Sequence, residues 1–449
     1  MKAKFSLIYI IILLFTAFYM PVQAFADTEP ELTAEAYILM DMKTGQVLAE
    51  KNSHARRSPA STTKIMTAII ALENASLDTE MTASQNAINS VGYDYVAAGI
   101  KPGEIIKLQN LLELMLITSA NEAGYIIAEN ISENGTVQGF ADMMNQKARD
   151  LGLTGTHFTN PCGIEDPNHY TTAYDLAVMA REAMQYETFR DIVIKTDIVM
   201  PDTNFRKSNE WKAGHLEYTN KLLKYRSKYF SKVTGIKTGY TDPAGRCLVS
   251  SAVNPEDMEL IAVVLGADVA NSDLVFVESQ KLLEYGFANF ALQDVVKSGK
   301  YIDRVEVADA VESKKVELIT DGDITHVLPI SAERRNAELT EEKTLNEPFA
   351  APIAQGQVLG KLEYFYKGES IGSVNIIAKE SIEKTTIAQI RDKYYEIIND
   401  ERFRLGLKIT VGAIVFLIIL RYVLKTISRR NKRKRRYDYS SNRKKHYRF

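Results

Sequence analysis

The chain has 449 residues, of which 45% are hydrophobic and 25% charged, and its formal net charge is −2. The length excludes a single ordinary domain, and the composition is that of a globular protein, so we expect two or more folded units. The six histidines and two cysteines show no His-x-x-x-His or Cys-x-x-Cys spacing. We therefore expect neither a metal site built by the protein nor another cofactor.

The first 26 residues have the pattern of a secretory signal. Two lysines precede an apolar stretch from Phe5 to Met20, and the small-x-small sequence AFA ends at Ala26. This pattern predicts a signal peptide over residues 1–26, with an uncleaved N-terminal anchor as the alternative. In an exported protein Cys162 and Cys247 have the option of a disulfide, although two isolated cysteines form no framework.

Strand and helix patterns alternate over the first 290 residues. β-prone residues between Ala34 and Asn52 predict a strand hairpin around a Lys-Thr-Gly turn. Helical spacing of apolar residues then predicts helices over residues 65–72, 108–117, 122–131 and 139–151. β-prone runs predict strands over residues 235–241, 246–253 and 259–267, followed by a helix over 272–285. A unit that opens and closes with strands around a helical middle predicts one α/β domain over residues 30–290.

Beyond residue 286 the chain changes to short β-prone runs joined by charged turns: VEVADAV, KKVELIT, THVLPI, VLGKLEYFY and SVNIIA. These runs predict a small all-β domain over residues 295–380. The charged segment from Ser331 to Pro348 is predicted to be a loop within it. Apolar residues at helical spacing after residue 386 then predict an amphipathic stalk over residues 381–404.

The C-terminal region predicts a membrane anchor. The apolar segment from Leu405 to Leu424 has about the length that crosses the bilayer core. Residues 421–449 hold thirteen lysines and arginines and one aspartate, a net charge of +12. Because basic segments stay in the cytoplasm, we predict a cytoplasmic tail over residues 425–449, with the bulk of the protein outside the cell membrane. A basic run that abuts a span is explained by topology, so we predict no nucleic-acid partner.

A serine and a lysine, Ser61 and Lys64, open an apolar run in SPASTTKIMTA. At a helix start the backbone N–H groups are unpaired and favour an anion, and Lys64 shares the face of Ser61 one turn on. A desolvated lysine can lose its proton and then accept that of a serine hydroxyl. The pair therefore predicts a nucleophile and its base on one turn. A second Ser-x-x-Lys, at Ser441, lies in the basic tail.

Two further polar triplets fall on the predicted elements. Ser119-Ala120-Asn121 lies at the break between two apolar helices, and Lys237-Thr238-Gly239 lies on a β-prone run, where the glycine lets a ligand approach the backbone closely. Each triplet alone is weak evidence. Ser132-Glu133-Asn134 and Lys43-Thr44-Gly45 repeat them where a helix end and a hairpin turn are sufficient explanations.

In chain order, the motifs beginning at Ser61, Ser119 and Lys237 resemble the signature of penicillin-binding proteins and serine β-lactamases. The sequences TSANEAG, NPCGIEDPNHYTTAYDLA and IKTGYTDPAGRCL look like those of the D-alanyl-D-alanine carboxypeptidases, the low-molecular-mass penicillin-binding proteins. The resemblance spans about residues 30–380. It implies a penicillin-binding, β-lactamase-like α/β fold with an antiparallel sheet, followed by the small β domain.

The resemblance also implies an activity. A serine enzyme of this kind removes the terminal D-alanine from peptidoglycan pentapeptide stems through an acyl-enzyme and is acylated by β-lactams. Ser61 is then the nucleophile, Lys64 its base and Ser119 the relay that passes a proton to the leaving amine.

The other positions are implied to bind substrate. Asn121 holds the substrate amide, and Lys237 and Thr238, followed by Gly239, bind the free carboxylate. The backbone N–H groups of Ser61 and Tyr240 form the oxyanion hole. Some relatives have histidine at the position of Tyr240, and the usual anchor of the family is an amphipathic helix rather than a spanning one.

Three alternatives remain open. A class A-like β-lactamase needs a carboxylate base, and Glu165 lies between the second and third motifs, although its surroundings look like those of a carboxypeptidase. A non-catalytic cell-wall-binding relative retains the fold without turnover, but every catalytic position is filled. A Ser/His/Asp hydrolase requires His169 and Asp166, and hydrogen bonding within a loop is a sufficient explanation for both residues.

Overall fold

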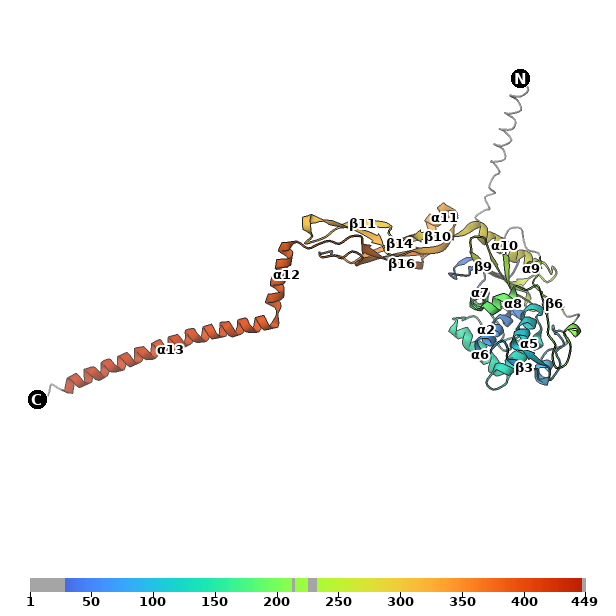
Figure 1. Ribbon diagram of the computed structural model, residues 1–449, viewed down its shortest axis with the longest axis horizontal. Helices are drawn as coiled ribbons and strands as arrows, with labels where there is room; N and C mark the ends of the chain where they lie inside the picture. The colour runs from blue at the N-terminus through green and yellow to red at the C-terminus, as the bar shows by residue number, and fades with distance from the viewer. Residues whose placement is uncertain (1–28, 212–214, 225–231, 446–449) are drawn as a thin grey trace, which may run out of the picture. The chain divides into compact units, whose positions relative to one another are not determined.

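The structure is a computed structural model that describes residues 29–211, 215–224 and 232–445 (Figure 1). The predicted signal peptide over residues 1–26 lies outside the described residues, as do the last four residues of the basic tail. The chain divides into two units. The first holds Met1–Val295 with Thr325–Thr340, and the second holds Val296–Ile324 with Glu341–Phe449.

The first unit contains a five-stranded antiparallel sheet with the order β2-β1-β9-β8-β7. Its strands are β1 (Ala36–Asp41), β2 (Val47–Lys51), β7 (Lys232–Thr241), β8 (Gly245–Val253) and β9 (Glu259–Ala267). The predicted hairpin and the three later strands are thus confirmed. Every residue from Leu260 to Leu265 is buried, so both faces of the sheet are covered. β7 lies at an edge, and its other side pairs with no described strand.

Helices fill the segment between β2 and β7, and the four predicted from apolar spacing correspond to α2, α4, α5 and α6. The helices of this segment are α2 (Lys64–Asn74), α3 (Gln85–Asn89), α4 (Leu108–Glu113), α5 (Asn121–Ile131), α6 (Val137–Asp150), α7 (Ala173–Ala183), α8 (Glu187–Val193) and α9 (Lys221–Lys224). Two short 3-10 helices, η1 (Ala60–Thr63) and η3 (Ser208–Glu210), and a π-helical segment, η2 (Leu114–Thr118), lie among them. Two strand pairs lie among them, β3 (Glu80–Thr82) with β4 (Ile105–Lys107) and β5 (Asp197–Val199) with β6 (His215–Glu217). All residues from Lys64 to Ala71 in α2 are buried, which makes α2 the central helix.

Residues 325–340 lie in the first unit, whereas the sequence analysis places them in the small β domain. α10 (Leu274–Asn289) packs on β8 and β9 and leads into β10 (Phe290–Val296), which pairs with β13 (Ile324–Pro329). Residues 325–340 belong to the first unit, and two hydrogen bonds tie them to it. The Ile330 N–H donates to the Asn289 carbonyl, and Gln293 Nε2 donates to the Pro329 carbonyl at 3.0 Å.

The second unit contains a five-stranded antiparallel sheet with the order β11-β12-β16-β15-β14. Its strands are β11 (Tyr301–Glu306), β12 (Lys315–Thr320), β14 (Leu339–Leu345), β15 (Val358–Tyr366) and β16 (Glu369–Ala378), with a short turn η5 (Val311–Ser313). The loop predicted from Ser331 to Pro348 is wrong, because this segment contains α11 (Ala332–Glu338) and β14. β14 buries none of its residues, so its sequence lacks the apolar alternation by which strands are recognised.

Two helices end the chain. α12 (Thr386–Asn399) confirms that the predicted stalk is helical, and Ile387, Ile390 and Tyr394 are exposed on it. α13 (Glu401–Lys445) contains the predicted span over residues 405–424. Within the described part of the chain, the stretch Glu401–Arg435 is the one helix long and apolar enough to cross a membrane.

Candidate active site

The Ser61–Lys64 pair lies at the entrance to α2. Ser61 belongs to the turn η1, and Lys64 is the first residue of the helix. Lys64 is fully buried, and its Nζ lies 2.8 Å from Ser61 Oγ, 2.8 Å from Asn121 Oδ1 and 3.1 Å from the Cys162 carbonyl oxygen. Burial lowers the pKa of Lys64 from 10.5 to about 8.

The three oxygen partners fix the orientation of the Lys64 amine. The amide oxygen of Asn121 and the carbonyl of Cys162 can only accept hydrogen bonds. A neutral amine has two N–H donors and one lone pair. In the protonated form Nζ donates to Ser61 Oγ at 2.8 Å. In the neutral form the two acceptors can take both N–H donors, and the lone pair is then available to the Ser61 hydroxyl.

The Cys162 carbonyl belongs to a turn that the sequence analysis did not predict to be part of the site. Asn160 Oδ1 accepts the N–H groups of Cys162, Gly163 and Ile164 at 3.1, 2.8 and 3.0 Å. Gly163 has a φ of +79°, and a Cβ there would lie 1.7 Å from the Ala60 carbonyl oxygen, so only glycine fits. The available signal was the Asn-Pro-Cys-Gly sequence, in which asparagine and glycine are turn formers.

Ser119 and Asn121 lie at the predicted break between two helices. Ser119 is buried with a left-handed backbone (φ +65°) between η2 and α5. Asn121 donates its N–H and its Nδ2 to the Val96 carbonyl at 3.0 and 2.9 Å. Among the residues that the structure describes, the Ser119 hydroxyl makes no direct hydrogen bond to Lys64 or Lys237. Asn121 is therefore joined to Ser61 through Lys64, and Ser119 lies two residues away.

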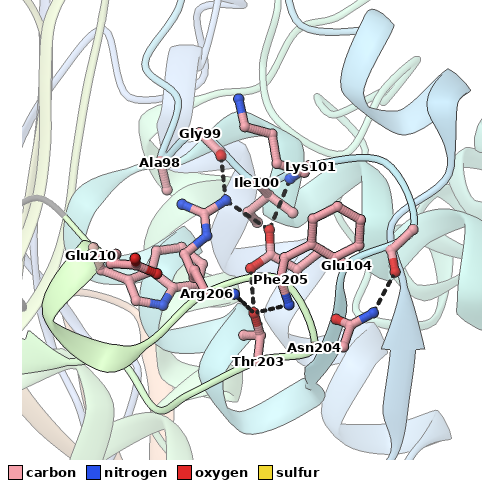
Figure 2. Close-up of polar contacts among 12 residues, drawn as sticks. Ala98, Gly99, Ile100, Lys101, Glu104, Thr203, Asn204, Phe205, Arg206 and Glu210 are labelled. Carbon is pink, nitrogen blue, oxygen red and sulfur yellow. Dashed lines mark hydrogen bonds and ion pairs between the residues drawn. The ribbon is translucent and has the colours of Figure 1, made fainter.

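The loop that carries Val96 is fixed by an ion pair between Arg206 and the buried Glu104, shown in Figure 2. Arg206 Nη2 donates to the Gly99 carbonyl at 2.6 Å and to Glu104 Oε2 at 2.7 Å, while Thr203 Oγ1 donates to Glu104 Oε1 at 2.7 Å. The Glu104 side chain is 0% exposed. On the loop's inner side, Glu122 Oε1 accepts the Ala98 and Gly99 N–H groups. None of these contacts was predicted from the sequence.

The Lys-Thr-Gly triplet on β7 lies against the Ser61 turn. A Cβ at Gly239 would lie 3.2 Å from Ser61 N, from Ala60 Cβ and from the Pro59 carbonyl oxygen, so the backbones of β7 and η1 are in direct contact. Thr238 Oγ1 lies 2.5 Å from Thr219 Oγ1. The Tyr240 side chain is 47% exposed.

Lys237 lies close to Lys64. Its side chain is fully buried, and Lys237 Nζ donates to the Thr238 carbonyl at 3.1 Å. Burial first, and then the charge of Lys64, hold the pKa of Lys237 well below its usual value of 10.5. The structure thus brings Ser61, Lys64, Asn121 and the Lys-Thr-Gly triplet together from α2, α5 and β7.

Glu165 and His169, the residues of two alternative functions, contact other groups. Glu165 Oε1 accepts hydrogen bonds from Ser58 Oγ at 2.9 Å and from Thr241 Oγ1, so it joins the end of β7 to the segment before Ser61. His169 Nδ1 accepts the Thr159 N–H at 3.1 Å, and its Nε2 lies 2.9 Å from Thr63 Oγ1.

These contacts argue against a Ser/His/Asp triad. Both ring nitrogens of His169 are engaged away from Ser61, and Asp166 Oδ1 accepts the Asn168 N–H instead of orienting the imidazole. Burial lowers the pKa of His169 to about 4. The structure has no disulfide between Cys162 and Cys247: both are free cysteines, and both are buried.

The fold and the site together are those of a penicillin-binding transpeptidase domain with a separate C-terminal β domain. A family model described as D-alanyl-D-alanine carboxypeptidase matches residues 23–269, and one described as penicillin-binding protein 5, C-terminal domain, matches residues 290–384. The chain belongs to the D-alanyl-D-alanine carboxypeptidase family. Its members are serine enzymes that act through an acyl-enzyme and bind β-lactams.

Individual relatives agree with this assignment. The carboxypeptidase DacF of Bacillus subtilis is 32% identical over 395 residues, which are 86% of this chain and 95% of the relative. The solved structure of penicillin-binding protein 5 from Haemophilus influenzae is 30% identical with a TM-score of 0.60, covering 80% of this chain and 99% of that one. The carboxypeptidase DacD from Francisella tularensis is 28% identical with a TM-score of 0.62, covering 82% and 98%.

Proposed function

We propose that Ser61 is the nucleophile of this D-Ala-D-Ala carboxypeptidase and that Lys64 is its base. The observation that carries the proposal is the position of Lys64 Nζ, 2.8 Å from Ser61 Oγ, with two acceptors at its other sides. A pKa of about 8 leaves roughly a tenth of the amine neutral at pH 7, enough to serve as a general base.

In the first step Ser61 Oγ attacks the carbonyl carbon of the penultimate D-alanine while its proton passes to Lys64 Nζ. The tetrahedral oxyanion lies between the N–H groups of Ser61 and Tyr240, whose segments are in contact at Gly239. The C–N bond then breaks, and the leaving amine receives a proton by way of Ser119. Water hydrolyses the remaining ester and regenerates Ser61 with a stem peptide shorter by one D-alanine.

The other polar residues bind the substrate in this proposal. Asn121 holds the substrate amide, and Thr238 faces the free carboxylate together with Lys237. The substrate is the pentapeptide stem of peptidoglycan, and a β-lactam acylates Ser61 in its place. The exposed edge of β7 offers backbone groups with which an extended peptide can pair.

We also propose the location of the enzyme. The apolar part of α13 spans the cell membrane, the basic tail over residues 425–449 stays in the cytoplasm, and the catalytic unit is exported by the segment 1–26. Deletion of residues 401–449 is expected to release the protein from membranes into the soluble fraction. Continued sedimentation with membranes would contradict the proposed span.

The test of the proposed chemistry is Ser61→Ala. The variant is expected to lose both covalent penicillin labelling and D-alanine release from a pentapeptide, measured by mass spectrometry. Ser76→Ala, a serine whose hydroxyl hydrogen-bonds to Thr79 on the surface, is the matched control and should keep both activities. Labelling that persists in Ser61→Ala at another residue would refute the assignment.

The same experiment addresses the β-lactamase alternative. The hydrogen bonds of Glu165 Oε1 go to Ser58 and Thr241 and not to Ser61 or Lys64, which favours a structural role for this carboxylate. The penicilloyl adduct on the wild-type protein is therefore expected to be long-lived, whereas rapid release would favour a β-lactamase.

A further inference from the structure

The orientation of the Asn121 amide decides which of its atoms faces Lys64. A carboxamide has an acceptor on one side and donors on the other, and only its oxygen can receive a hydrogen bond from an amine. The Val96 carbonyl takes the Asn121 Nδ2 donor at 2.9 Å and the Asn121 backbone N–H at 3.0 Å. Because Nδ2 is held there, Oδ1 faces Lys64 Nζ at 2.8 Å. A carbonyl outside the three motifs therefore sets the direction of this amide.

Val96 lies on a loop that has little packing of its own. The Val96 side chain is 53% exposed, and Tyr93 on the same loop is fully exposed. The loop is held instead at the Gly99 peptide, three residues further on, from two sides. Glu122 Oε1 accepts the Gly99 N–H at 2.8 Å, and Arg206 Nη2 donates to the Gly99 carbonyl at 2.6 Å. The place of the Val96 carbonyl therefore depends on these two contacts.

The Arg206 side chain is itself held firmly (Figure 2). Its Nη2 donates to Glu104 Oε2 at 2.7 Å, and Glu104 Oε1 accepts the Thr203 hydroxyl at 2.7 Å. The guanidinium also lies over the ring of the buried Trp211, 4.3 Å from its centroid. A planar guanidinium that is both stacked and hydrogen-bonded to a carboxylate has few orientations left. The Gly99 carbonyl thus meets a donor of fixed position.

The Glu104–Arg206 pair is poorly explained by stability alone. The Glu104 side chain is fully buried and that of Arg206 is 14% exposed. Removing two charges from water offsets much of their mutual attraction, so such a pair is weak evidence for a gain in stability. What the pair does provide is a precisely placed donor for a loop that packs weakly. In the part of the chain that the structure describes, none of the polar contacts of Arg206 goes to Ser61 or Lys64.

We propose that Arg206 is a positioning residue for the acylation of Ser61. By holding the Gly99 carbonyl it keeps the Val96 carbonyl against Asn121, and so fixes the direction of the Asn121 amide. This inference rests on the proposed function and leaves its chemical steps unchanged. Arg206 acts on the reaction only through the loop, because it contacts none of the reacting atoms.

Loss of the Arg206 contact has a defined chemical effect at Lys64. An amide released by Val96 can turn its NH2 group towards the amine. The protonated amine then loses an acceptor, which lowers its pKa, and the neutral amine accepts the NH2 donor with the lone pair that the Ser61 hydroxyl needs. Acylation should consequently slow, and its pH midpoint should move to lower pH. The titratable groups whose charges act on this amine are retained: Glu122, Cys162 and Lys237.

The test is the rate of penicillin labelling of Arg206→Gln, measured from pH 6 to 10.5. The rate constant at the plateau is expected to fall about 10- to 100-fold, the cost of a small misplacement in an active site, while the fraction of protein finally labelled stays the same. The midpoint should move to lower pH, and Arg206→Lys should recover part of the rate. Arg190→Gln, which breaks a two-bonded pair with Glu259 elsewhere in the unit, is the matched control. It should keep the wild-type rate constant and midpoint even where its melting temperature falls.

The outcomes separate this inference from the proposed function. If Arg206→Gln lowers only the melting temperature or the labelled fraction, the residue is merely structural and the inference is wrong. A slower rate with an unchanged midpoint also contradicts it, because the amide has then not turned. If Arg206→Gln fails to fold, Thr203→Val, which removes one partner of Glu104, decides by the same criteria with a smaller expected shift. If the wild-type protein is not acylated at Ser61 at all, it is the proposed function that fails.

Discussion

Lys64 acts as a base only while its amine is neutral, so the pH dependence of acylation reports its pKa. Burial lowers that pKa from 10.5 to about 8, which raises the neutral fraction at pH 7 about 300-fold. The rate of penicillin acylation should therefore increase with pH and reach half of its plateau near pH 8. Asn121→Asp should move this midpoint, because it places a carboxylate where an amide oxygen now lies 2.8 Å from the amine.

A negative charge at that distance favours the protonated amine and raises its pKa by about 1–3. At pH 7 the acylation rate of Asn121→Asp should consequently fall by about 10- to 1000-fold. The rate should recover as the pH rises, which distinguishes a shifted base from a damaged site. The assay is the initial rate of labelling by a fluorescent penicillin, measured from pH 6 to 10.5.

Glu122→Gln is the matched variant of opposite sign. The charge of Glu122 raises the pKa of Lys64, and glutamine keeps the carbonyl oxygen that accepts the Ala98 and Gly99 N–H groups. Its acylation midpoint should therefore move to lower pH. If both variants keep the wild-type midpoint, Lys64 is not the group that accepts the proton.

Three further outcomes are expected. Lowering the pH from 6.5 to 4 should destabilise the protein, because the pKa of His169 is 6.5 in the unfolded chain and about 4 in the folded one. The free energy of unfolding should drop by up to about 3 kcal/mol as the pH falls through this range. In urea melts His169→Gln should show a smaller drop than the control His54→Gln, which changes an exposed histidine. Gly239→Ala should slow penicillin acylation about 100-fold with little loss of thermal stability, because its methyl displaces β7 from Ser61 N; unchanged acylation would show that the contact is unimportant. Glu165→Gln should leave release of the penicilloyl adduct unchanged, and much slower release would make Glu165 a deacylating base.

The parts of the fold that were predicted correctly are those with a local signal. The helices α2, α5 and α6 follow from apolar spacing within each segment. Two of the three motifs lie at the ends of such helices, and the third lies on β7, which was predicted from β-prone residues. β14 was missed because its side chains face solvent and give no apolar alternation. Strand β13 was assigned to the small domain, since nothing local indicates that it pairs with β10.

The candidate site was predictable in its motifs and not in its supports. The carbonyl that completes the surroundings of Lys64 belongs to Cys162, 98 positions further along the chain. The Glu104–Arg206 pair joins residues 102 positions apart. Contacts of this kind depend on tertiary packing. A single sequence does not show that Cys162 pairs with Lys64 or that Arg206 pairs with Glu104.

The bend at Ala60 has a consequence for how a penicillin signal is interpreted. Ala60 has a φ of +46°, a conformation that costs a non-glycine residue about 1–3 kcal/mol, and Gly163 and Gly239 abut it from two remote segments. The Ser61 hydroxyl is thus held in position only while the segments that contain Ala60, Gly163 and Gly239 are packed together. A fluorescent antibiotic applied to cells would count correctly assembled molecules and ignore misassembled ones, which an antibody against the same polypeptide would not distinguish.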